Sequence, residues 1–198
     1  MTRTTTARLT ALGLAAMTLL AACSGGGAAA SPTPADAPAT SDAPAMSDAL
    51  PPGALDGEAW ATATLTDVET GETFTIAGLA GKPVFVETMA IWCSSCRAQQ
   101  ARFTEAFARI PAGSAEYVVL TVEPSETAED LARYKADRGF TGRYAVAGKE
   151  LSKALEVAFG SNALNPPSVP LIFIAPSGEV SFSTGAESVD EIVARAAG

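Results

Sequence analysis

The sequence predicts an α/β fold in which a mixed central β-sheet is flanked by helices. Two observations predict it. Apolar, β-rich runs alternate with segments whose apolar residues recur every three to four positions, as in strands separated by helices. The chain then finishes with two short strands around the turn Pro176-Ser177-Gly178 and one more helix, which favours an antiparallel pair at the end of the sheet.

Charge and composition exclude several classes of function. The formal net charge is −9, and removal of Met1–Ala22, which carries two arginines and no acid, would make it −11. An acidic chain without clustered Lys and Arg is not expected to bind nucleic acid. The chain has no histidine, so Cys–His proteases, His-based hydrolase triads and most zinc or copper sites are excluded.

The first 22 residues are predicted to be a lipoprotein signal peptide. A basic start at Arg3 and Arg8 precedes an apolar run of 14 residues, Leu9–Ala22, which is shorter than the roughly 20 residues of a membrane span. The run ends directly before Cys23, and this arrangement resembles the bacterial lipoprotein signal, whose cysteine becomes the lipidated N-terminus. We expect Cys23 to anchor the protein to a bacterial membrane, outside the cytoplasm. The alternative is an ordinary signal peptide followed by a chance cysteine.

Residues 23–53 are predicted to form a disordered tether. Ala, Ser, Pro and Gly dominate this segment, and it has too few large apolar side chains to form a core. The folded domain is expected over residues 54–198, where the composition changes. This length is sufficient for a single hydrophobic core.

The first half of this domain is expected to contain a hairpin, a central strand and a helix. Residues 60–67 and 72–76 are each β-rich and are separated by a turn that ends in glycine, which predicts two paired strands. The apolar strand Val84–Val86 follows, and a helix with an inward apolar stripe opens at Cys93. This helix is expected to end near Pro111, because proline and glycine stop it there.

The second half alternates strands and helices. Tyr117–Val122 is a continuous apolar run, typical of a strand covered on both faces. A capping box predicts the start of a helix over Ser125–Arg138. The later expected elements are the strand Tyr144–Ala147, a helix with Leu151, Leu155 and Phe159 on one face, the strands Leu171–Ala175 and Glu179–Ser183, and a last helix with Val189, Ile192, Val193 and Ala196 inward.

Two cysteines, Cys93 and Cys96, are expected on the first turn of the first long helix. The unpaired N–H groups and the positive end of the helix dipole favour a thiolate there, so Cys93 is the candidate nucleophile. Their spacing favours thiol–disulfide exchange, in which Cys93 forms a mixed disulfide with a partner and Cys96 resolves it.

Other uses of this cysteine pair are less consistent with the sequence. A purely structural disulfide would close a loop of only about four residues, which stabilises by roughly 2 kcal/mol in the chain-entropy model, against about 4.7 kcal/mol for a 100-residue loop. A zinc site would need two further ligands, which only carboxylates could supply. Haem attachment through Cys-x-x-Cys-His is excluded because the next residue is Arg97. We therefore expect no metal and no cofactor.

The cysteine pair is one of several features that occur in a recognisable order between Trp60 and Ala197. They are the leading hairpin, Gly81-Lys82-Pro83, Trp92-Cys93-Ser94-Ser95-Cys96, Ser168-Val169-Pro170-Leu171 and Pro176-Ser177-Gly178. The segment resembles the thioredoxin superfamily and, within it, the TlpA-like thiol–disulfide oxidoreductases, which are membrane-anchored and extracytoplasmic. The resemblance implies a thioredoxin-like fold with an extra N-terminal β-hairpin. Thioredoxin has Gly-Pro between its cysteines where this chain has Ser-Ser, and because that dipeptide influences the redox potential, the potential stays open.

The resemblance also implies roles for three further residues, and Trp92 is another candidate on the basis of its residue type. Glu87 matches a buried Asp that shuttles the proton of the resolving cysteine, and burial would raise its pKa enough for this role; the alternative is a Glu that reaches solvent at the strand end. Pro170 matches the cis-proline that faces the dithiol, unless it is an ordinary proline at the first residue of a strand. Val169 would then offer backbone groups to an extended substrate. Trp92 is either a platform for substrate or a partly buried aromatic.

The resemblance implies an enzyme that exchanges disulfides with exported proteins. It favours a reductase, for example of the cytochrome c maturation type, that receives electrons from a membrane thiol carrier. Two alternatives stay open: an oxidase that forms disulfides in exported proteins with the same residues, and a non-catalytic thioredoxin-fold lipoprotein that binds a partner or a metal. Copper chaperones of related fold use Cys-x-x-x-Cys plus His, and this chain has neither.

Overall fold

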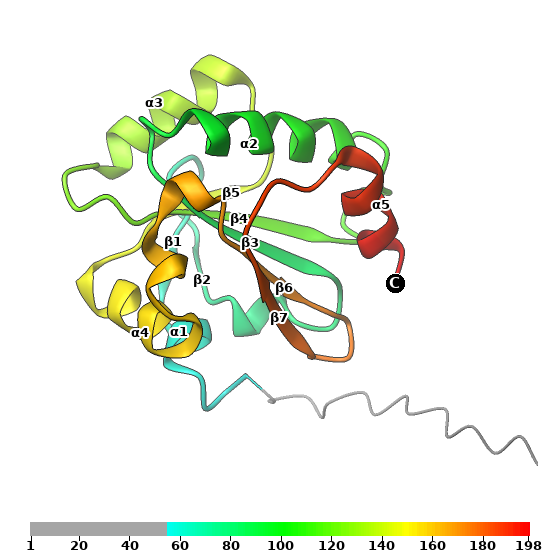
Figure 1. The fold of residues 1–198 in the computed structure, drawn as a ribbon, viewed down its shortest axis with the longest axis horizontal. Helices are drawn as coiled ribbons and strands as arrows, with labels where there is room; N and C mark the ends of the chain where they lie inside the picture. The colour runs from blue at the N-terminus through cyan, green and yellow to red at the C-terminus, as the bar shows by residue number, and fades with distance from the viewer. Residues whose placement is uncertain (1–54) are drawn as a thin grey trace, which may run out of the picture. The chain divides into compact units, whose positions relative to one another are not determined.

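The computed structural model describes residues 55–198 (Figure 1). The predicted signal peptide Met1–Ala22, the predicted lipidation site Cys23 and the tether up to residue 53 lie outside the described residues. Within residues 55–198, no helix has both the length and the apolarity that a membrane crossing requires.

A five-stranded mixed sheet with the strand order β5-β4-β3-β6-β7 forms the centre of the domain. β3 is parallel to β4, and β4 to β5, whereas β6 runs antiparallel to both β3 and β7. The mixed sheet predicted from the sequence is therefore confirmed, and β3, with all its residues buried, is the central strand. The strands are β3 (Val84–Met89), β4 (Glu116–Thr121), β5 (Arg143–Val146), β6 (Leu171–Ile174) and β7 (Val180–Ser183).

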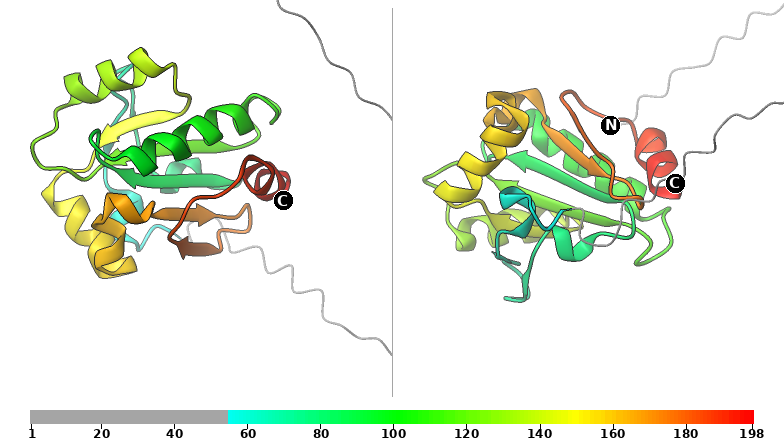
Figure 2. Two further views of the ribbon diagram at one scale, coloured as in Figure 1. Left: turned by 45° about the horizontal axis from the view of Figure 1, so that its top comes forward. Right: turned by 90° about the horizontal axis from the view of Figure 1, so that it is seen from below.

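Helices cover both faces of this sheet, as predicted (Figures 1 and 2). Successive residues of a strand point to opposite faces. In β3, Phe85 and Met89 lie in the apolar cluster under α2, while Val84 and Val86 lie in the cluster on the α4 side. The helices on the first face are α2 (Ser94–Phe107), α3 (Ala128–Arg138) and α5 (Val189–Ala197), and those on the second are α1 (Ala59–Thr62) and α4 (Lys149–Phe159).

The N-terminal hairpin is shorter than the sequence predicts. Its strands, β1 (Leu65–Thr66) and β2 (Thr73–Phe74), form a separate antiparallel pair. The prediction of a strand that begins at residue 60 is wrong, because Trp60 lies in α1 and packs edge-on against Phe159 of α4, with 5.0 Å between the ring centroids. The helical turn buries the Trp60 ring against α4, and this packing outweighs the β-rich appearance of the segment.

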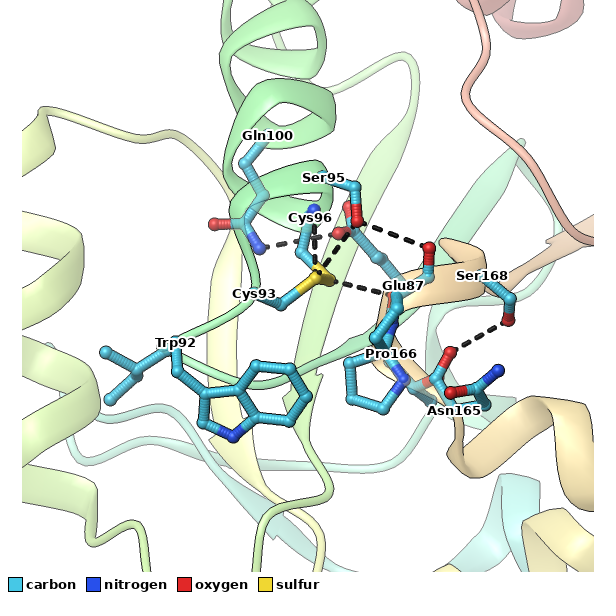
Figure 3. Close-up of a disulfide and its surroundings, with 12 residues drawn as sticks. Glu87, Trp92, Cys93, Ser95, Cys96, Gln100, Asn165, Pro166 and Ser168 are labelled. Carbon is cyan, nitrogen blue, oxygen red and sulfur yellow. Dashed lines mark hydrogen bonds between the residues drawn. A yellow bond between two sulfur atoms is a disulfide. The ribbon is translucent and has the colours of Figure 1, made fainter.

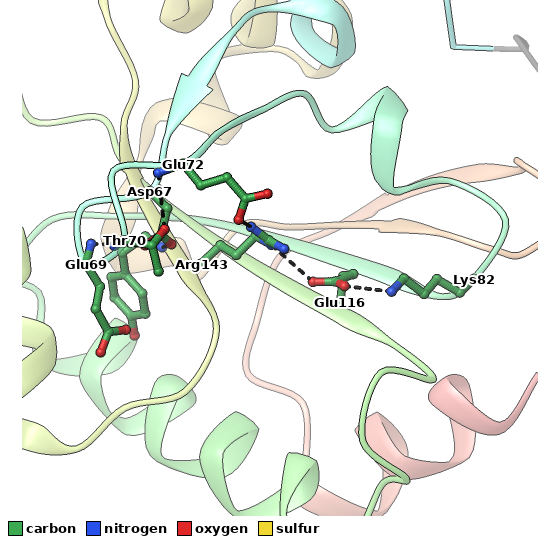
Figure 4. Close-up of polar contacts among 8 residues, drawn as sticks. Asp67, Glu69, Thr70, Glu72, Lys82, Glu116 and Arg143 are labelled. Atoms are coloured by element: carbon green, nitrogen blue, oxygen red, sulfur yellow. Dashed lines mark hydrogen bonds and ion pairs between the residues drawn. The ribbon is translucent and has the colours of Figure 1, made fainter.

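Polar contacts fasten this hairpin to the main sheet (Figure 4). The buried carboxylate of Asp67 accepts hydrogen bonds from two N–H groups of its own turn and from the N–H of Tyr144 in β5. Arg143 of β5 forms an ion pair with Glu72 of the hairpin at 3.3 Å. The hairpin therefore lies against β5, which is an edge strand of the main sheet.

The other elements lie within a few residues of their predicted positions. The predicted capping box is present, because Thr127 caps α3 and shares three hydrogen bonds with Asp130. The expected loop 160–169 contains two short 3₁₀ turns, η2 (Ser161–Leu164) and η3 (Pro166–Ser168), and a third, η1 (Ala77–Leu79), precedes β3. η3 packs against the first turns of α2 and so borders the two cysteines.

Candidate dithiol site

Cys93 is the N-cap residue of α2, where the chain has left β3 and the helix begins. Its backbone is extended (φ −73°, ψ 111°), and its Sγ accepts a hydrogen bond from the N–H of Cys96 at 3.1 Å. The two sulfur atoms are joined in a disulfide (Figure 3). In the reduced protein, the same N–H group and the helix dipole would favour a thiolate at Cys93.

The two sulfurs differ in their surroundings. Cys93 is 2% exposed and Cys96 is fully buried. The carbonyl oxygen of Pro166 lies 3.1 Å from the Sγ of Cys96, where it would accept the S–H of the reduced thiol. The hydroxyl of Ser95 lies 3.3 Å from the Sγ of Cys93 and 3.3 Å from the carbonyl oxygen of Pro167. A partner therefore reaches Cys93 before it reaches Cys96.

The loop residue in contact with the disulfide is Pro166, which the sequence analysis did not single out. All peptide bonds of residues 55–198 are trans, so the prediction of a cis bond before Pro170 is wrong. Val169 takes a left-handed conformation (φ 52°, ψ 64°), and its N–H donates to the carbonyl of Pro166 at 2.9 Å. This tight turn leads the chain into β6 with a trans bond. Because the N–H of Val169 already donates to Pro166, it cannot also donate to a carbonyl of a substrate strand. The carbonyl of Pro170 accepts the N–H of Thr88 at 3.3 Å, beside β3.

Glu87 lies on the face of β3 that α2 covers, and it is fully buried. The alternative interpretation, in which it reaches solvent, is therefore wrong. The hydroxyl of Tyr117 donates to its Oε2 at 2.5 Å, and the Nε2 of Gln100 donates to its Oε1 at 3.4 Å. Burial raises the pKa of Glu87 to about 8, and the two hydrogen bonds oppose this rise. Gln100 follows Cys96 by one helical turn on the same side of α2, so Glu87 lies beneath the part of α2 that carries Cys96 (Figure 3).

Trp92 stands out from the surface directly before Cys93, with 57% of its area exposed. Its indole N–H donates to the carboxylate of Glu123 at 3.1 Å. A groove of about 450 Å³ runs beside it, and Tyr134 and Arg138 are among the residues that line this groove. Trp92 is therefore an exposed aromatic and not a partly buried one.

No protein-family model and no curated protein matches the sequence, but solved structures match the domain. A thiol:disulfide interchange protein of the thioredoxin family from Chlorobium tepidum TLS is 23% identical, with 69% of this chain and 93% of that one covered and a TM-score of 0.57. A secreted disulfide oxidoreductase of Mycobacterium tuberculosis is 18% identical, with 70% and 96% covered and a TM-score of 0.53. StoA from Bacillus subtilis is 17% identical, with 67% and 95% covered and a TM-score of 0.51. The chain has a thioredoxin-like fold.

In this thioredoxin-like domain, two carboxylates that the sequence analysis missed fix the segment before the cysteines. Glu126 accepts the N–H of Ile91 at 2.7 Å and the hydroxyl of Thr121 at 2.5 Å, and Glu123 holds the indole of Trp92. The carboxyl ends of neighbouring parallel strands meet at the same edge of a sheet. Acidic residues directly after β4 were therefore a usable signal for contacts with the segment that follows β3.

The sequence analysis also missed Gln100 and Tyr117. The sequence contains a local signal for the position of Gln100 but none for the contact of Tyr117. Gln100 lies four residues after Cys96, so helical spacing alone places it on the same side of α2. The contact between Tyr117 and Glu87 depends on the register between β3 and β4, which has no local signature. Among residues 55–198, no three His, Cys, Asp or Glu side chains are grouped closely enough to hold a metal ion.

Proposed function

We propose that the protein is a thiol–disulfide oxidoreductase that exchanges disulfides with cysteines of other proteins through Cys93 and Cys96. The position of the pair supports this most strongly. The N-cap sulfur accepts the N–H of Cys96, and it is the more accessible of the two sulfurs. A thioredoxin-like fold shared with several disulfide oxidoreductases adds to this support.

In the reducing direction, the Cys93 thiolate attacks one sulfur of a partner disulfide. A mixed disulfide forms, and the partner's other sulfur leaves as a thiolate. The Cys96 thiolate then attacks the Sγ of Cys93, the Cys93–Cys96 disulfide closes, and the partner's second sulfur leaves. The partner gains two electrons and the protein dithiol loses two; the protons of Cys93 and Cys96 pass to the two released thiolates directly or through solvent.

Glu87 is proposed to accept the proton of Cys96 in the second step. Burial brings the pKa of Glu87 to about 8, so its carboxylate is a stronger base than that of a solvent-exposed glutamate and is better matched to the proton of a thiol. The carboxyl is buried beneath the same part of α2 as Cys96. Trp92 is proposed to hold the partner beside Cys93, and the segment from Pro166 to Pro170, including Val169, to form the other wall of the site.

The location and direction of the reaction are also proposals. Lipidation at Cys23 would tether the domain to a bacterial membrane outside the cytoplasm, where it would reduce exported proteins with electrons from a membrane thiol carrier. Apocytochrome c is one example of such a substrate. A disulfide-forming oxidase is the alternative, and the reduction potential separates the two. A value of about −270 mV supports a reductase, and a value of about −120 mV supports an oxidase.

Cysteine variants of the full chain test the catalytic proposal with insulin disulfide reduction as the assay. Cys93→Ala should reduce the rate to that of the buffer, because no thiolate remains to form the mixed disulfide. Cys96→Ser should accumulate a mixed disulfide with the partner that a non-reducing gel detects. Cys23→Ala is the matched cysteine control, and it should lose membrane attachment but keep activity in solution. Full activity of Cys93→Ala would contradict the assignment and leave the binding-protein alternative.

A further inference from the structure

Five polar side chains from five different elements meet under α2 in an otherwise apolar layer. They are Glu87 of β3, Gln100 of α2, Tyr117 of β4, Tyr134 of α3 and Tyr144 of β5, and each is at most 6% exposed. The chain has three tyrosines in all, and every one of them belongs to this network. A buried polar network of this size destabilises the core unless its members are satisfied, so its arrangement needs an explanation.

The amide of Gln100 is oriented by two tyrosines. Its Oε1 accepts the hydroxyl of Tyr134 at 3.0 Å and the hydroxyl of Tyr144 at 3.1 Å. Burial raises the pKa of both tyrosines, so each keeps its proton and donates at neutral pH. With Oε1 occupied by two donors, the Nε2 group is directed towards Glu87.

The sheet register explains why a glutamine fits here. Glu87 pairs with Val119, and Val119 with Tyr144, so these three residues form one row across β3, β4 and β5. Gln100 bridges the two ends of this row from α2, because it bonds to both Glu87 and Tyr144. Tyr117 reaches Glu87 from β4, with its ring stacked on Phe103 at 4.0 Å between centroids.

Both oxygens of Glu87 therefore accept hydrogen bonds from groups that are themselves uncharged. Such donors stabilise the ionised carboxylate, whereas burial stabilises the protonated acid. The titratable groups around Glu87 are Tyr117 from β4, Tyr144 from β5 and Tyr134 from α3, and Figure 3 shows Cys96 of α2 beside it. Two cations, Arg97 and Arg138, act on Tyr134 at the edge of the network.

We propose that Tyr117 and Gln100 are positioning residues that keep the buried Glu87 available as a base for Cys96, and that Tyr134 and Tyr144 hold Gln100 in the required orientation. This inference rests on the proposed function and deepens it. Without the two donors the carboxyl would hold its proton over a wider pH range, and the resolving step would start only at higher pH. The two donors thus set the pH at which Cys96 can attack.

The test is the pH dependence of the resolving step. Cys93 is first linked to a chromophoric aromatic thiol, and release of this thiol by Cys96 is followed from pH 6 to pH 10. The full chain should show a midpoint at a pH of about 8, and Glu87→Gln should lose this titration. Tyr117→Phe keeps the ring but removes the donor to Glu87. It should move the midpoint upward by about one to two pH units and slow release at pH 7 about tenfold or more.

Two further variants separate positioning from packing. Tyr134→Phe combined with Tyr144→Phe frees the Gln100 amide and should also move the midpoint upward, by less than Tyr117→Phe, because Gln100 is the more distant donor. Phe103→Leu disturbs the same packing without removing a hydrogen bond, so it should lower the melting temperature and leave the midpoint in place. An unchanged midpoint in Tyr117→Phe would overturn the proposal.

A measurement that needs no substrate tests this inference independently of the proposed function. Infrared difference spectra against Glu87→Gln report the protonation of the Glu87 carboxyl directly in the oxidised protein. An upward shift of this titration in Tyr117→Phe supports the network even if the protein proves inactive with every disulfide substrate. No shift overturns the network even if insulin is reduced normally.

Discussion

The two faces of the central sheet bury polar residues of different kinds. β3 supplies one buried polar residue to the face on the α4 side and another to the face under α2. On the α4 side it supplies Thr88, whose hydroxyl donates to the carbonyl of Ala163 at 2.6 Å in an apolar cluster. Under α2 it supplies Glu87, a titratable group surrounded by donors. The first arrangement satisfies a neutral group without any pH dependence. The second lowers stability at high pH, because the folded protein buries a carboxyl group that loses its proton there.

The largest effect expected from this difference is in the pH dependence of stability. Glu87 has a pKa of about 8 in the folded protein and about 4.3 in an unfolded chain, so between these values the folded state holds a proton that the unfolded state lacks. The stability that this group contributes is complete below about pH 4 and is lost as the pH rises through about 8. The loss is on the order of 5 kcal/mol.

Urea unfolding of the oxidised full chain from pH 4.5 to pH 9 measures this loss, with Glu87→Gln as the comparison. As the pH rises, the free energy of unfolding of the parent protein should fall relative to that of Glu87→Gln. Parallel pH profiles of the two proteins would show that Glu87 titrates normally. The two faces of the sheet would then not differ in the pH dependence of stability.

A smaller effect is expected from a substitution on the α4 side. Leu155 of α4 is fully buried in the apolar cluster, and Leu155→Ala should lower the free energy of unfolding by about 2–5 kcal/mol. Because no titratable group is involved, the loss should be the same at pH 5 and pH 9. Insulin reduction by the folded fraction should not change. A loss that varies with pH would mean that the two faces are coupled.

The smallest effect on stability is expected at the surface. Trp92 beside the disulfide and Val157 on α4 are both largely exposed, so Trp92→Ala and the control Val157→Ala should each change the free energy of unfolding by no more than about 0.5 kcal/mol. Trp92→Ala should raise the KM for a protein disulfide and leave the rate with a small aromatic disulfide unchanged. Equal KM values for the two variants would argue against a platform at Trp92.

Features that depend on a short stretch of chain were predictable. The cysteine pair at the start of α2 follows from a strand, a break and a helical pattern in sequence order, and Cys93 is indeed the N-cap. The capping box of α3 is read from Thr127 and Asp130 alone. In both cases the partners lie within one helical turn, so no distant residue can change the outcome.

Features that depend on distant partners were predicted poorly. The β-rich appearance of the segment around Trp60 gave a strand, but contact with Phe159 makes it a helical turn. The sequence motif at Pro170 suggested a cis bond, but the left-handed Val169 brings Pro166 to the disulfide instead. Local propensity is weak compared with the packing free energy of a buried ring or turn.

By itself, the sequence determined the order of strands and helices from β3 onward, the mixed sheet and the place of the two sulfurs at the start of a helix. It did so because hydrophobic periodicity and capping act over a few residues. The tertiary structure alone decided that Glu87 is buried and that Tyr117, Tyr144 and Gln100 surround it. These side chains come from separate strands and a helix, and only the strand register and the packing of α2 on the sheet bring them within hydrogen-bonding distance.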